Sequence, residues 1–439
     1  MFVDWWPEGR FCTLQIPILL ERCPAPQTWF TKRSQIATAQ NRKRKTRQMN
    51  KRIGIAVLGL GWMGEAHSRS VLRIPSLFPK RSFDPKLVVC ADTEPSRRER
   101  AVSDFGFERA VEDWREAINS DDVDAVWVTA PNMLHVPMIE AAAAAGKAIF
   151  SEKPIGGKPE QTVAALAAAK KAGVVTGVGY NYIWAPLVIH AKNLIDSGAL
   201  GEITHYRGRF LSMYGSDELG LLTWRFIMDQ AGYGVTSDIL SHSVSMAQYL
   251  IGDITEVIGM KNTTIPKRPI PTGAAGHYGR GKPEDPKGNV ENEDFASMLC
   301  TFKNGATGTF EVSRTMVGPE SQNAFEVYGT KGAISWNLEK LNELQYYELI
   351  EDKNSGYKTI YGGDRFPFHA NFVPGQANAV GLEDFVAIED YSFLESLATG
   401  KPFSPSFKEA VDVVSVQQAL INSWESRSWE KVHDLGSAI

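Results

Sequence analysis

The sequence is constrained most strongly by a short apolar run that leads directly into three glycines. Residues 53–60 read Ile-Gly-Ile-Ala-Val-Leu-Gly-Leu. Such a nearly continuous apolar run is typical of a strand buried on both faces of a parallel sheet. The run overlaps the motif Gly59-Leu60-Gly61-Trp62-Met63-Gly64, which a helical stretch through residues 65–67 follows. The order of strand, glycine turn and helix predicts the first unit of a dinucleotide-binding fold.

Each glycine of this motif has its own physical reason. Gly59 permits the tight turn from strand to helix, Gly61 lets backbone N–H groups approach a pyrophosphate, and Gly64 allows the helix to pack closely on the strand. The phosphates would lie at the positive end of the helix dipole. A glycine motif alone is often only a turn, but the flanking strand and helix favour cofactor binding, in which Trp62 and Met63 would take part.

A second apolar strand, residues 86–91, ends in Asp92. A carboxylate at this position can accept hydrogen bonds from both adenosine ribose hydroxyls and would repel a 2′-phosphate, which favours NAD. Asp92 follows Gly64 by 28 positions, a longer spacing than usual. Arg97 and Arg98 lie just beyond and could accommodate a phosphate, so NADP stays an alternative. The other interpretation of these arginines is a solvated helix start.

Strands and helices alternate through the following residues. Strands are predicted at 124–129, 148–150 and 174–178, and helices at 137–145 and 160–172. Repeated units of this length indicate a doubly wound parallel sheet over about residues 52–178. Ligands of such sheets bind beyond the carboxyl ends of the strands, so the residues that follow the strands are the informative ones.

Two short motifs follow strands of this sheet. Ala130-Pro131-Asn132-Met133-Leu134-His135 comes after the strand at 124–129, and Ser151-Glu152-Lys153-Pro154 comes after the strand at 148–150. Pro154 restricts the backbone and therefore fixes where Lys153 points. A helix-start proline beside a surface lysine is an equally good interpretation of that motif in isolation.

The glycine motif, the Ala-Pro-Asn-x-x-His motif and the Glu-Lys-Pro motif, in this order, resemble the glucose–fructose oxidoreductase/inositol dehydrogenase/MocA (Gfo/Idh/MocA) family. The resemblance covers about residues 52–430. It is strongest to sugar dehydrogenases of the levoglucosan dehydrogenase type, with further support from Asn181-Tyr182, Trp224-Arg225-Phe226 and residues 402–407. It implies an α/β fold with an N-terminal Rossmann domain (52–178). A C-terminal α+β substrate and assembly domain (179–439) with a large open, mostly antiparallel sheet would follow, and its open face would form a homotetramer or homodimer.

The second domain contains a pair of polar residues on a predicted helix, residues 236–250. The i, i+4 spacing of Asp238 and His242 places them on one helix face, where a carboxylate can orient an imidazole or raise its basicity. Such a pair is more often a surface salt bridge, but the resemblance places it opposite Lys153. Ser245 stands where relatives usually have another Asp. Ile183 and Trp184 replace basic residues, which suggests a less polar, aromatic pocket.

The resemblance implies NAD(P)-dependent oxidation of a secondary hydroxyl of a sugar, glycoside, anhydrosugar or cyclic polyol. His242 would act as general base with Lys153 and Asp238 beside it, and no metal is expected. The implied cofactor-binding residues are Gly59, Gly61, Trp62, Met63, Gly64, Asp92, Arg97, Ala130, Pro131, Asn132, His135, Glu152, Lys153 and Asn181. The implied substrate-binding residues are Lys153, Tyr182, Trp224, Arg225, Asp238 and His242. A glycosidase-like or lyase-like enzyme using NAD transiently and a non-catalytic dinucleotide sensor stay open.

Charge separates the first residues from the rest of the chain. The chain has 47 basic and 51 acidic residues. Residues 1–52 contain eleven of the basic and three of the acidic residues, so the remainder contains 36 basic and 48 acidic residues. An acidic body argues against a nucleic-acid partner. Four cysteines without CxxC spacing and no apolar run long enough for a bilayer favour a cytoplasmic enzyme without membrane contact. Residues 1–51 are expected to be a flexible extension, best read as a leader before Met49.

Two other interpretations of that extension stay open, a transit peptide and a nuclear or polyanion tag. Four of its aromatic residues (Trp5, Trp6, Trp29 and Phe30) could instead dock on the body or on another subunit. The Gly/Pro-rich segment 265–288 is too long for a simple connector and is expected at a functional site or an interface, with His277 and Tyr278 as candidates.

Overall fold

The computed structural model describes residues 50–273, 278–351, 353–437 and 439. Residues 50–439 form one compact unit. The predictions about the basic extension and His277 lie outside the described residues. In the part of the chain that the structure describes, every helix is too short or too polar to cross a lipid bilayer.

The first layer is a six-stranded parallel sheet with the strand order β3-β2-β1-β4-β5-β6. Its strands are β1 (Lys51–Leu58), β2 (Phe83–Ala91), β3 (Arg109–Val111), β4 (Ala125–Val128), β5 (Ala148–Ser151) and β6 (Thr176–Val178). Its helices are α2 (Trp62–Leu77), α3 (Pro95–Phe105), α4 (Trp114–Ile118), α5 (His135–Ala144) and α6 (Pro159–Ala172). The predicted doubly wound sheet is therefore confirmed.

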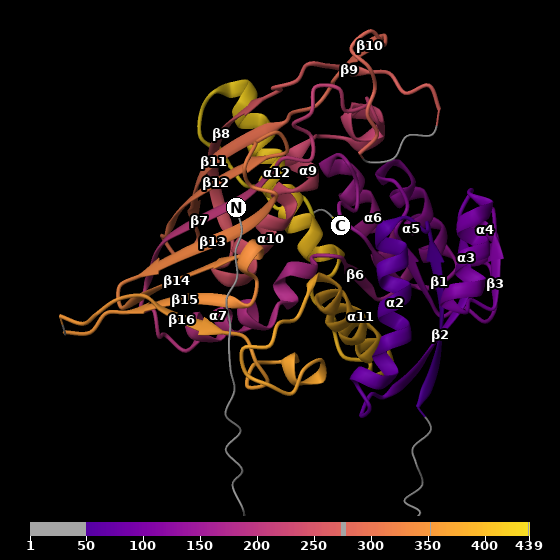
Figure 1. Cartoon of the computed structure of the whole chain (residues 1–439), viewed down its shortest axis with the longest axis horizontal. Helices are drawn as coiled ribbons and strands as arrows, with labels where there is room; N and C mark the ends of the chain where they lie inside the picture. The colour runs from indigo at the N-terminus through magenta and orange to yellow at the C-terminus, as the bar shows by residue number, and fades with distance from the viewer. Residues whose placement is uncertain (1–49, 274–277, 352, 438) are drawn as a thin grey trace, which may run out of the picture. The chain divides into compact units, whose positions relative to one another are not determined.

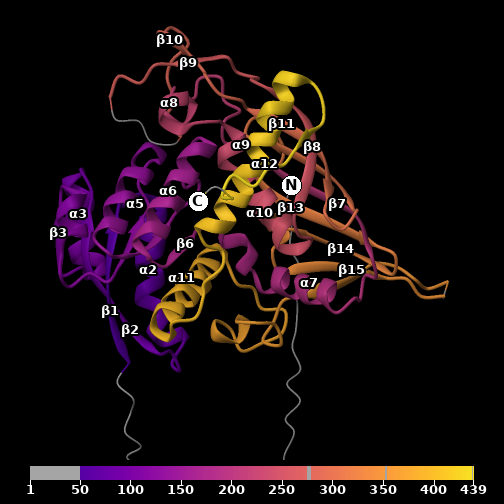
Figure 2. The same cartoon turned by 180° about the vertical axis from the view of Figure 1, so that it is seen from behind.

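Both faces of this sheet are buried, which explains the continuous apolar run of β1. Ala56 and Leu58 pack into one hydrophobic cluster with α4, α5 and α6, whereas Ile55 and Val57 pack into another with α2 and α3. Helix α11 (Leu382–Thr399), from near the C-terminus, joins the second cluster and lies beside α2 (Figures 1 and 2). The sequence-based boundary at residue 179 separates α11 from the helix it packs against.

The second layer is a nine-stranded sheet with the order β16-β15-β14-β13-β7-β12-β11-β8-β17. Its strands are β7 (Ile203–Ser212), β8 (Ile254–Asn262), β11 (Phe295–Phe302), β12 (Thr307–Ser313), β13 (Ser321–Gly329), β14 (Gly332–Asn337), β15 (Glu343–Glu348), β16 (Lys358–Tyr361) and β17 (Glu430–Lys431). All neighbours are antiparallel except β7 and β12. This confirms the predicted mostly antiparallel sheet.

Helices cover one face of the large sheet. They are α7 (Pro186–Asp196), α10 (Leu240–Leu250) and α12 (Phe407–Ser426), and α12 runs along β8 (Figure 2). Residues on this face, such as Met298 and Phe310, are buried, whereas Leu299 on the opposite face is exposed. The alternation of inward apolar and outward residues is what an antiparallel sheet with one covered face requires.

The prediction of a single helix over residues 236–250 is wrong. The structure has α9 (Val235–Asp238) and α10, with Ile239 between them. The break falls where the Asp238 carbonyl accepts hydrogen bonds from the Ser241 hydroxyl at 2.8 Å and from Lys153 Nζ at 3.3 Å. Such contacts compete with continued helical hydrogen bonding.

The Gly/Pro-rich segment 265–288 is only partly a loop. It contains β9 (Lys267–Pro269), which pairs with β10 (Lys287–Asn289) in a two-stranded ribbon. The Leu222 N–H donates to the Pro269 carbonyl at 2.8 Å, so the ribbon is attached to the chain that leads into α8 (Met228–Ala231). Among the two candidates in this segment, Tyr278 is described and is 80% exposed.

Candidate active site

The glycine turn between β1 and α2 has the geometry that its three glycines predict. Gly59 has φ +98°, and a Cβ there would lie 2.8 Å from Ala130 Cα. A Cβ on Gly64 would lie 2.0 Å from the Gly59 carbonyl oxygen, whereas a Cβ on Gly61 would meet no atom within 4 Å. Gly59 and Gly64 are therefore needed for packing, and Gly61 leaves open space at the N-terminus of α2. That space fits a pyrophosphate bound by backbone N–H groups.

Asp92 supports this turn from the end of β2. Its carboxylate accepts hydrogen bonds from the Leu60 N–H at 2.7 Å and from the Glu94 N–H at 2.9 Å. Arg97 donates to the same carboxylate at 3.4 Å, and Arg98 donates to the Asp92 carbonyl at 2.6 Å. The two arginines thus pair around Asp92 and are not simply a solvated helix start.

His135 lies beneath the two loops whose motifs were predicted to hold the cofactor. Its ring is buried, with Nδ1 at 2.8 Å from the Pro154 carbonyl and Nε2 at 2.6 Å from the Ala130 carbonyl. Burial lowers the pKa of His135. The ring ties the loops together, while Asn132 donates to the Ala231 carbonyl at 3.1 Å.

Lys153, which follows β5 of the parallel sheet, contacts Asp238, the last residue of α9. Lys153 Nζ donates to Asp238 Oδ1 at 2.6 Å and to the Asp238 carbonyl at 3.3 Å. Tyr214, just beyond the end of β7, donates its hydroxyl to Asp238 Oδ2 at 3.1 Å. The carboxylate is therefore bonded through both oxygens, and Lys153 is its partner where the sequence pattern had paired it with His242.

His242 lies in the first turn of α10 within an aromatic pocket. The ring centroids of Tyr182, Tyr180 and Phe210 lie 4.6, 6.0 and 6.1 Å from its own. Trp184, which the sequence suggested as a pocket residue, stacks instead on Phe403 at 6.0 Å. The predicted aromatic surroundings thus exist, but they come from other residues.

Charges and burial set the protonation states here. Burial alone would raise the pKa of Asp238, but the charges of Lys153 and Arg225 and the Lys153 hydrogen bond outweigh it and hold that pKa well below its usual value. The pKa of His242 lies well below its usual value because of burial and then the charge of Lys153, although Asp238 opposes the shift. A neutral imidazole therefore stands beside an ionised Lys–Asp pair.

The remaining predicted residues lie at the edges of this cluster. Arg225 stacks over the Trp224 ring at 4.4 Å, and its charge reaches Asp238. Asn181 is buried beside Tyr182 in a 3-10 turn that follows β6. Glu152 is buried, and its Oε2 accepts the Lys153 N–H at 3.1 Å while Oε1 faces His67.

Sequence reasoning missed three residues of the cluster, Tyr214, Tyr180 and Phe210. Each is an aromatic residue at or near a strand end, but aromatic residues recur throughout the chain and local sequence does not single these out. His67 and its partner Asp390 were also missed, because they are 323 positions apart in the chain.

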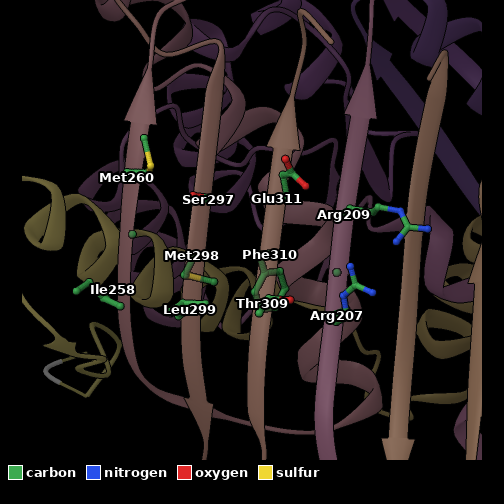
Figure 3. Close-up of a pocket in the computed structure, with 12 residues that line it drawn as sticks. Arg207, Arg209, Ile258, Met260, Ser297, Met298, Leu299, Thr309, Phe310 and Glu311 are labelled. Carbon is green, nitrogen blue, oxygen red and sulfur yellow. The ribbon is translucent and has the colours of Figure 1, made fainter. Parts of the chain in front are cut away.

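A shallow hollow of about 500 Å³ lies on the outer face of the large sheet, away from this cluster (Figure 3). Side chains of β7, β8, β11 and β12 line it, among them Arg207, Met260 and Leu299. Neither Lys153 nor His242 lines this hollow. Among the described residues, no group of three or more His, Cys, Asp or Glu side chains is arranged to hold a metal ion.

A glycine turn at the carboxyl edge of a parallel sheet, in the same compact unit as the Lys153–Asp238 pair and His242, is typical of a dinucleotide-dependent oxidoreductase. Comparison with known proteins agrees. Residues 53–180 match the oxidoreductase family with an NAD-binding Rossmann fold, and residues 188–335 match the Gfo/Idh/MocA C-terminal domain. The chain therefore belongs to the Gfo/Idh/MocA family of NAD-dependent oxidoreductases, as the sequence motifs predicted.

Two relatives and one solved structure show which members of the family the chain is similar to. The chain is 34% identical over 388 residues to levoglucosan dehydrogenase of Pseudarthrobacter phenanthrenivorans, covering 88% of this chain and 99% of that protein. It is 32% identical over 288 residues to scyllo-inositol 2-dehydrogenase (NAD(+)) of Bacillus subtilis, covering 65% and 74%. Levoglucosan dehydrogenase in complex with NADH and L-sorbose has a similar structure, with a TM-score of 0.83, 33% identity, and coverage of 88% and 100%.

Proposed function

We propose that the protein oxidises a secondary hydroxyl of a sugar, glycoside, anhydrosugar or cyclic polyol to a ketone, with NAD as hydride acceptor. The observation that carries this proposal is the Lys153–Asp238 ion pair beside the neutral imidazole of His242. A base and a hydrogen-bond donor for one oxygen are what alcohol oxidation requires. The named activities of the two relatives, on an anhydrosugar and on an inositol, support the substrate class.

In the proposed mechanism, His242 takes the hydroxyl proton of the substrate. The carbon-bound hydrogen leaves with its electron pair for the cofactor, and a ketone remains. Lys153 donates a hydrogen bond to the reacting oxygen and stabilises the alkoxide that develops there. Asp238 keeps the ammonium group of Lys153 aimed at this position, with Tyr214 bonded to its second oxygen. NAD, when bound, supplies the hydride acceptor.

We propose that the cofactor is held by the residues that the motifs indicate. Gly59, Gly61 and Gly64 would form the pyrophosphate turn, with Trp62 and Met63 opening α2 beside it. Asp92 and Arg97 would meet the adenosine ribose, and Ala130, Pro131, Asn132, Glu152 and Asn181 would surround the nicotinamide half. His135 would support them from below, since its ring nitrogens lie 2.8 and 2.6 Å from the Pro154 and Ala130 carbonyl oxygens.

Preference for NAD over NADP rests on Asp92. Its carboxylate is fixed by two backbone N–H groups, so it stays where a 2′-phosphate would be repelled. We expect NAD to bind at least about tenfold more tightly than NADP, a difference of about 1.4 kcal/mol. Equal affinity in a calorimetric titration of both nucleotides would contradict this assignment, and tighter NADP binding would move the selectivity to Arg97 and Arg98.

The experiment that tests the function follows NADH absorbance with NAD and a panel of anhydrosugars, glucosides and inositols. Steady NADH formation is expected. Conversion of substrate without NADH would instead support a glycosidase-like or lyase-like enzyme, and tight NAD binding without conversion would support a sensor. His242→Ala should lower turnover by about 10²–10⁴-fold and leave NAD binding intact. The exposed His433 provides the matched control His433→Ala.

We propose further that the outer face of the large sheet packs against another subunit. Met260 and Leu299 are 58% and 51% exposed on this face. Leu299→Glu should then lower the mass measured by light scattering, whereas an unchanged mass would contradict this interface. A reducing compartment such as the cytoplasm fits the two buried free thiols of the described residues, Cys90 and Cys300.

A further inference from the structure

Beneath the cofactor side of the site, a buried histidine connects three parts of the chain. His67 lies on α2, three residues after the glycine motif, and is 0% exposed. Its Nδ1 lies 2.9 and 3.0 Å from the two carboxylate oxygens of Asp390 on α11, and its Nε2 lies 3.2 Å from Glu152 Oε1. The Trp127 indole N–H also donates to Asp390 Oδ1 at 2.9 Å.

The geometry around His67 is satisfied when both ring nitrogens carry a proton and both carboxyl groups are ionised. A neutral imidazole has one N–H, so one of its two carboxylate contacts would join lone pairs on both sides. An imidazolium donates to both. Burial alone would lower the pKa of His67, but the charges and hydrogen bonds of Asp390 and Glu152 outweigh burial and raise it to about 10.

A third buried acid stands next to this group. Glu389 is 0% exposed, and the Trp184 side chain is the hydrogen-bond donor that faces its carboxyl group. Burial, together with the nearby charges of Glu152 and Asp390, raises the pKa of Glu389 well above its usual value. The raised pKa keeps Glu389 uncharged, and the imidazolium of His67 offsets one of the two negative charges of Glu152 and Asp390.

The same contacts continue to the catalytic cluster. Glu152 Oε2 accepts the backbone N–H of Lys153, and its carboxylate fits against Gly179, where a Cβ would lie 2.6 Å from Oε1. Lys153 in turn bonds Asp238 through its ammonium group. A continuous series of polar contacts thus runs from Asp390 on α11 through His67 and Glu152 to Lys153.

Stability alone is a weak reason for such a series, because well-packed apolar residues often replace buried ion pairs at no cost. We propose that His67, held as an imidazolium by Asp390, is a positioning residue for hydride transfer, which acts by fixing Glu152 and with it the backbone of Lys153. This inference rests on the proposed dehydrogenase function. It makes α11 part of the machinery on the cofactor side of the site.

The protonation state is tested without turnover. Histidines labelled with ¹⁵N are observed by long-range NMR correlation at pH 8, and the His67 signals are assigned as those lost in His67→Gln. Both ring nitrogens are expected to carry protons in the wild type. Other groups that face this region are His135, Tyr182 and Glu389, and none of them lies at hydrogen-bond distance from the ring. A neutral ring at pH 8 would overturn the proposal.

The positioning role is tested by a double-mutant cycle of His67→Gln and Glu152→Gln. The His67 variant should lose about 10-fold to 100-fold in kcat, because small displacements of catalytic groups cost rates of this order. The Kd for ADP, which probes the glycine turn, should stay the same. If His67 acts through Glu152, the double variant should lose no more than the worse single variant. Multiplied losses would overturn that route.

His369→Gln is the matched control. That ring is also buried, but its Nε2 bonds the Asn378 carbonyl at 2.8 Å, outside the series of contacts. An equal loss of kcat in this variant, or unchanged kcat in His67→Gln, would overturn the proposal. If the wild type turns over no substrate, the dehydrogenase function fails instead, while the NMR result still decides the protonation state.

Discussion

Alanine substitutions at two glycines of the same motif should have opposite effects: Gly64→Ala should lower stability, and Gly61→Ala should weaken NAD binding. At Gly64 an added Cβ would lie 2.0 Å from the Gly59 carbonyl oxygen and 3.0 Å from Thr129 Oγ1. Gly59 is fixed in a left-handed turn of φ +98°, so helix α2 has to retreat from it. At Gly61 the nearest atoms are beyond 4 Å, and the residue has φ −73°, which alanine adopts freely.

The structure gives the magnitudes. In Gly64→Ala the contact has to open by about 1 Å, and such overpacking costs about 1–3 kcal/mol. The helix preference of alanine returns at most about 1 kcal/mol, so we expect the free energy of unfolding to fall by about 1–2 kcal/mol. Gly61→Ala should change that free energy by only a few tenths of a kcal/mol, because the loss from alanine at a helix N-cap, about 0.5–1 kcal/mol, is offset by a gain of about 0.4–1 kcal/mol from a less flexible unfolded chain.

Binding should show the reverse order. The methyl group of Gly61→Ala would occupy the space through which backbone N–H groups meet the pyrophosphate, so NAD affinity should fall at least about tenfold, or about 1.4 kcal/mol. Urea unfolding with equal m-values and calorimetric NAD titration measure the two effects. Gly356→Ala is the control, because a Cβ there meets no atom within 4 Å and the residue is exposed.

Two results would refute this reasoning. Wild-type NAD affinity in Gly61→Ala would mean that the pyrophosphate does not pass over this residue. Wild-type stability in Gly64→Ala would mean that the turn between β1 and α2 gives way easily and that close packing does not explain the third glycine.

Three further predictions concern groups around the site. Tyr214→Phe removes the donor to Asp238 Oδ2, which should lower kcat/KM by about tenfold, the value of roughly one hydrogen bond, without changing the Kd for NAD; an unchanged kcat/KM would contradict it. The guanidinium of Arg314 lies 2.7 Å from the buried carboxylate of Asp294. Arg314→Met leaves that carboxylate buried without its partner and should lower the free energy of urea unfolding by about 3–5 kcal/mol. A loss below about 1 kcal/mol would show that Asp294 does not stay a buried, unpaired charge. The pKa of His67 is raised from 6.5 to about 10 in the folded state, so the protonated ring contributes its full stability below pH 6.5 and loses it as pH rises through 10. The difference in unfolding free energy between the wild type and His67→Gln should therefore shrink between these pH values. A difference that stays constant would disprove the imidazolium.

Local pattern was sufficient for much of the fold. The run 53–60 and its glycines were recognisable because a strand buried on both faces needs continuous apolar residues, and a tight turn onto a helix needs glycine. The large, mostly antiparallel second sheet was expected from the family resemblance, and the structure has it. The helix at 236–250 was predicted as continuous because periodicity does not report side-chain contacts such as those of Lys153 and Ser241 with the Asp238 carbonyl, where the helix breaks.

The sequence by itself determined the family, the dinucleotide turn and the residue types near the chemistry, since each depends on neighbours within a few positions along the chain. Only the tertiary structure decided the partners. In the folded chain Asp238 bonds Lys153, which is 85 residues away in the sequence, and His67 bonds Asp390, which is 323 residues away. Hydrogen bonds and ion pairs act over about 3 Å in space, whereas separation along the chain carries no information about such distances once the chain is folded. The sequence therefore identifies which groups are available, and the packing of α2, β5 and α11 decides which of them meet.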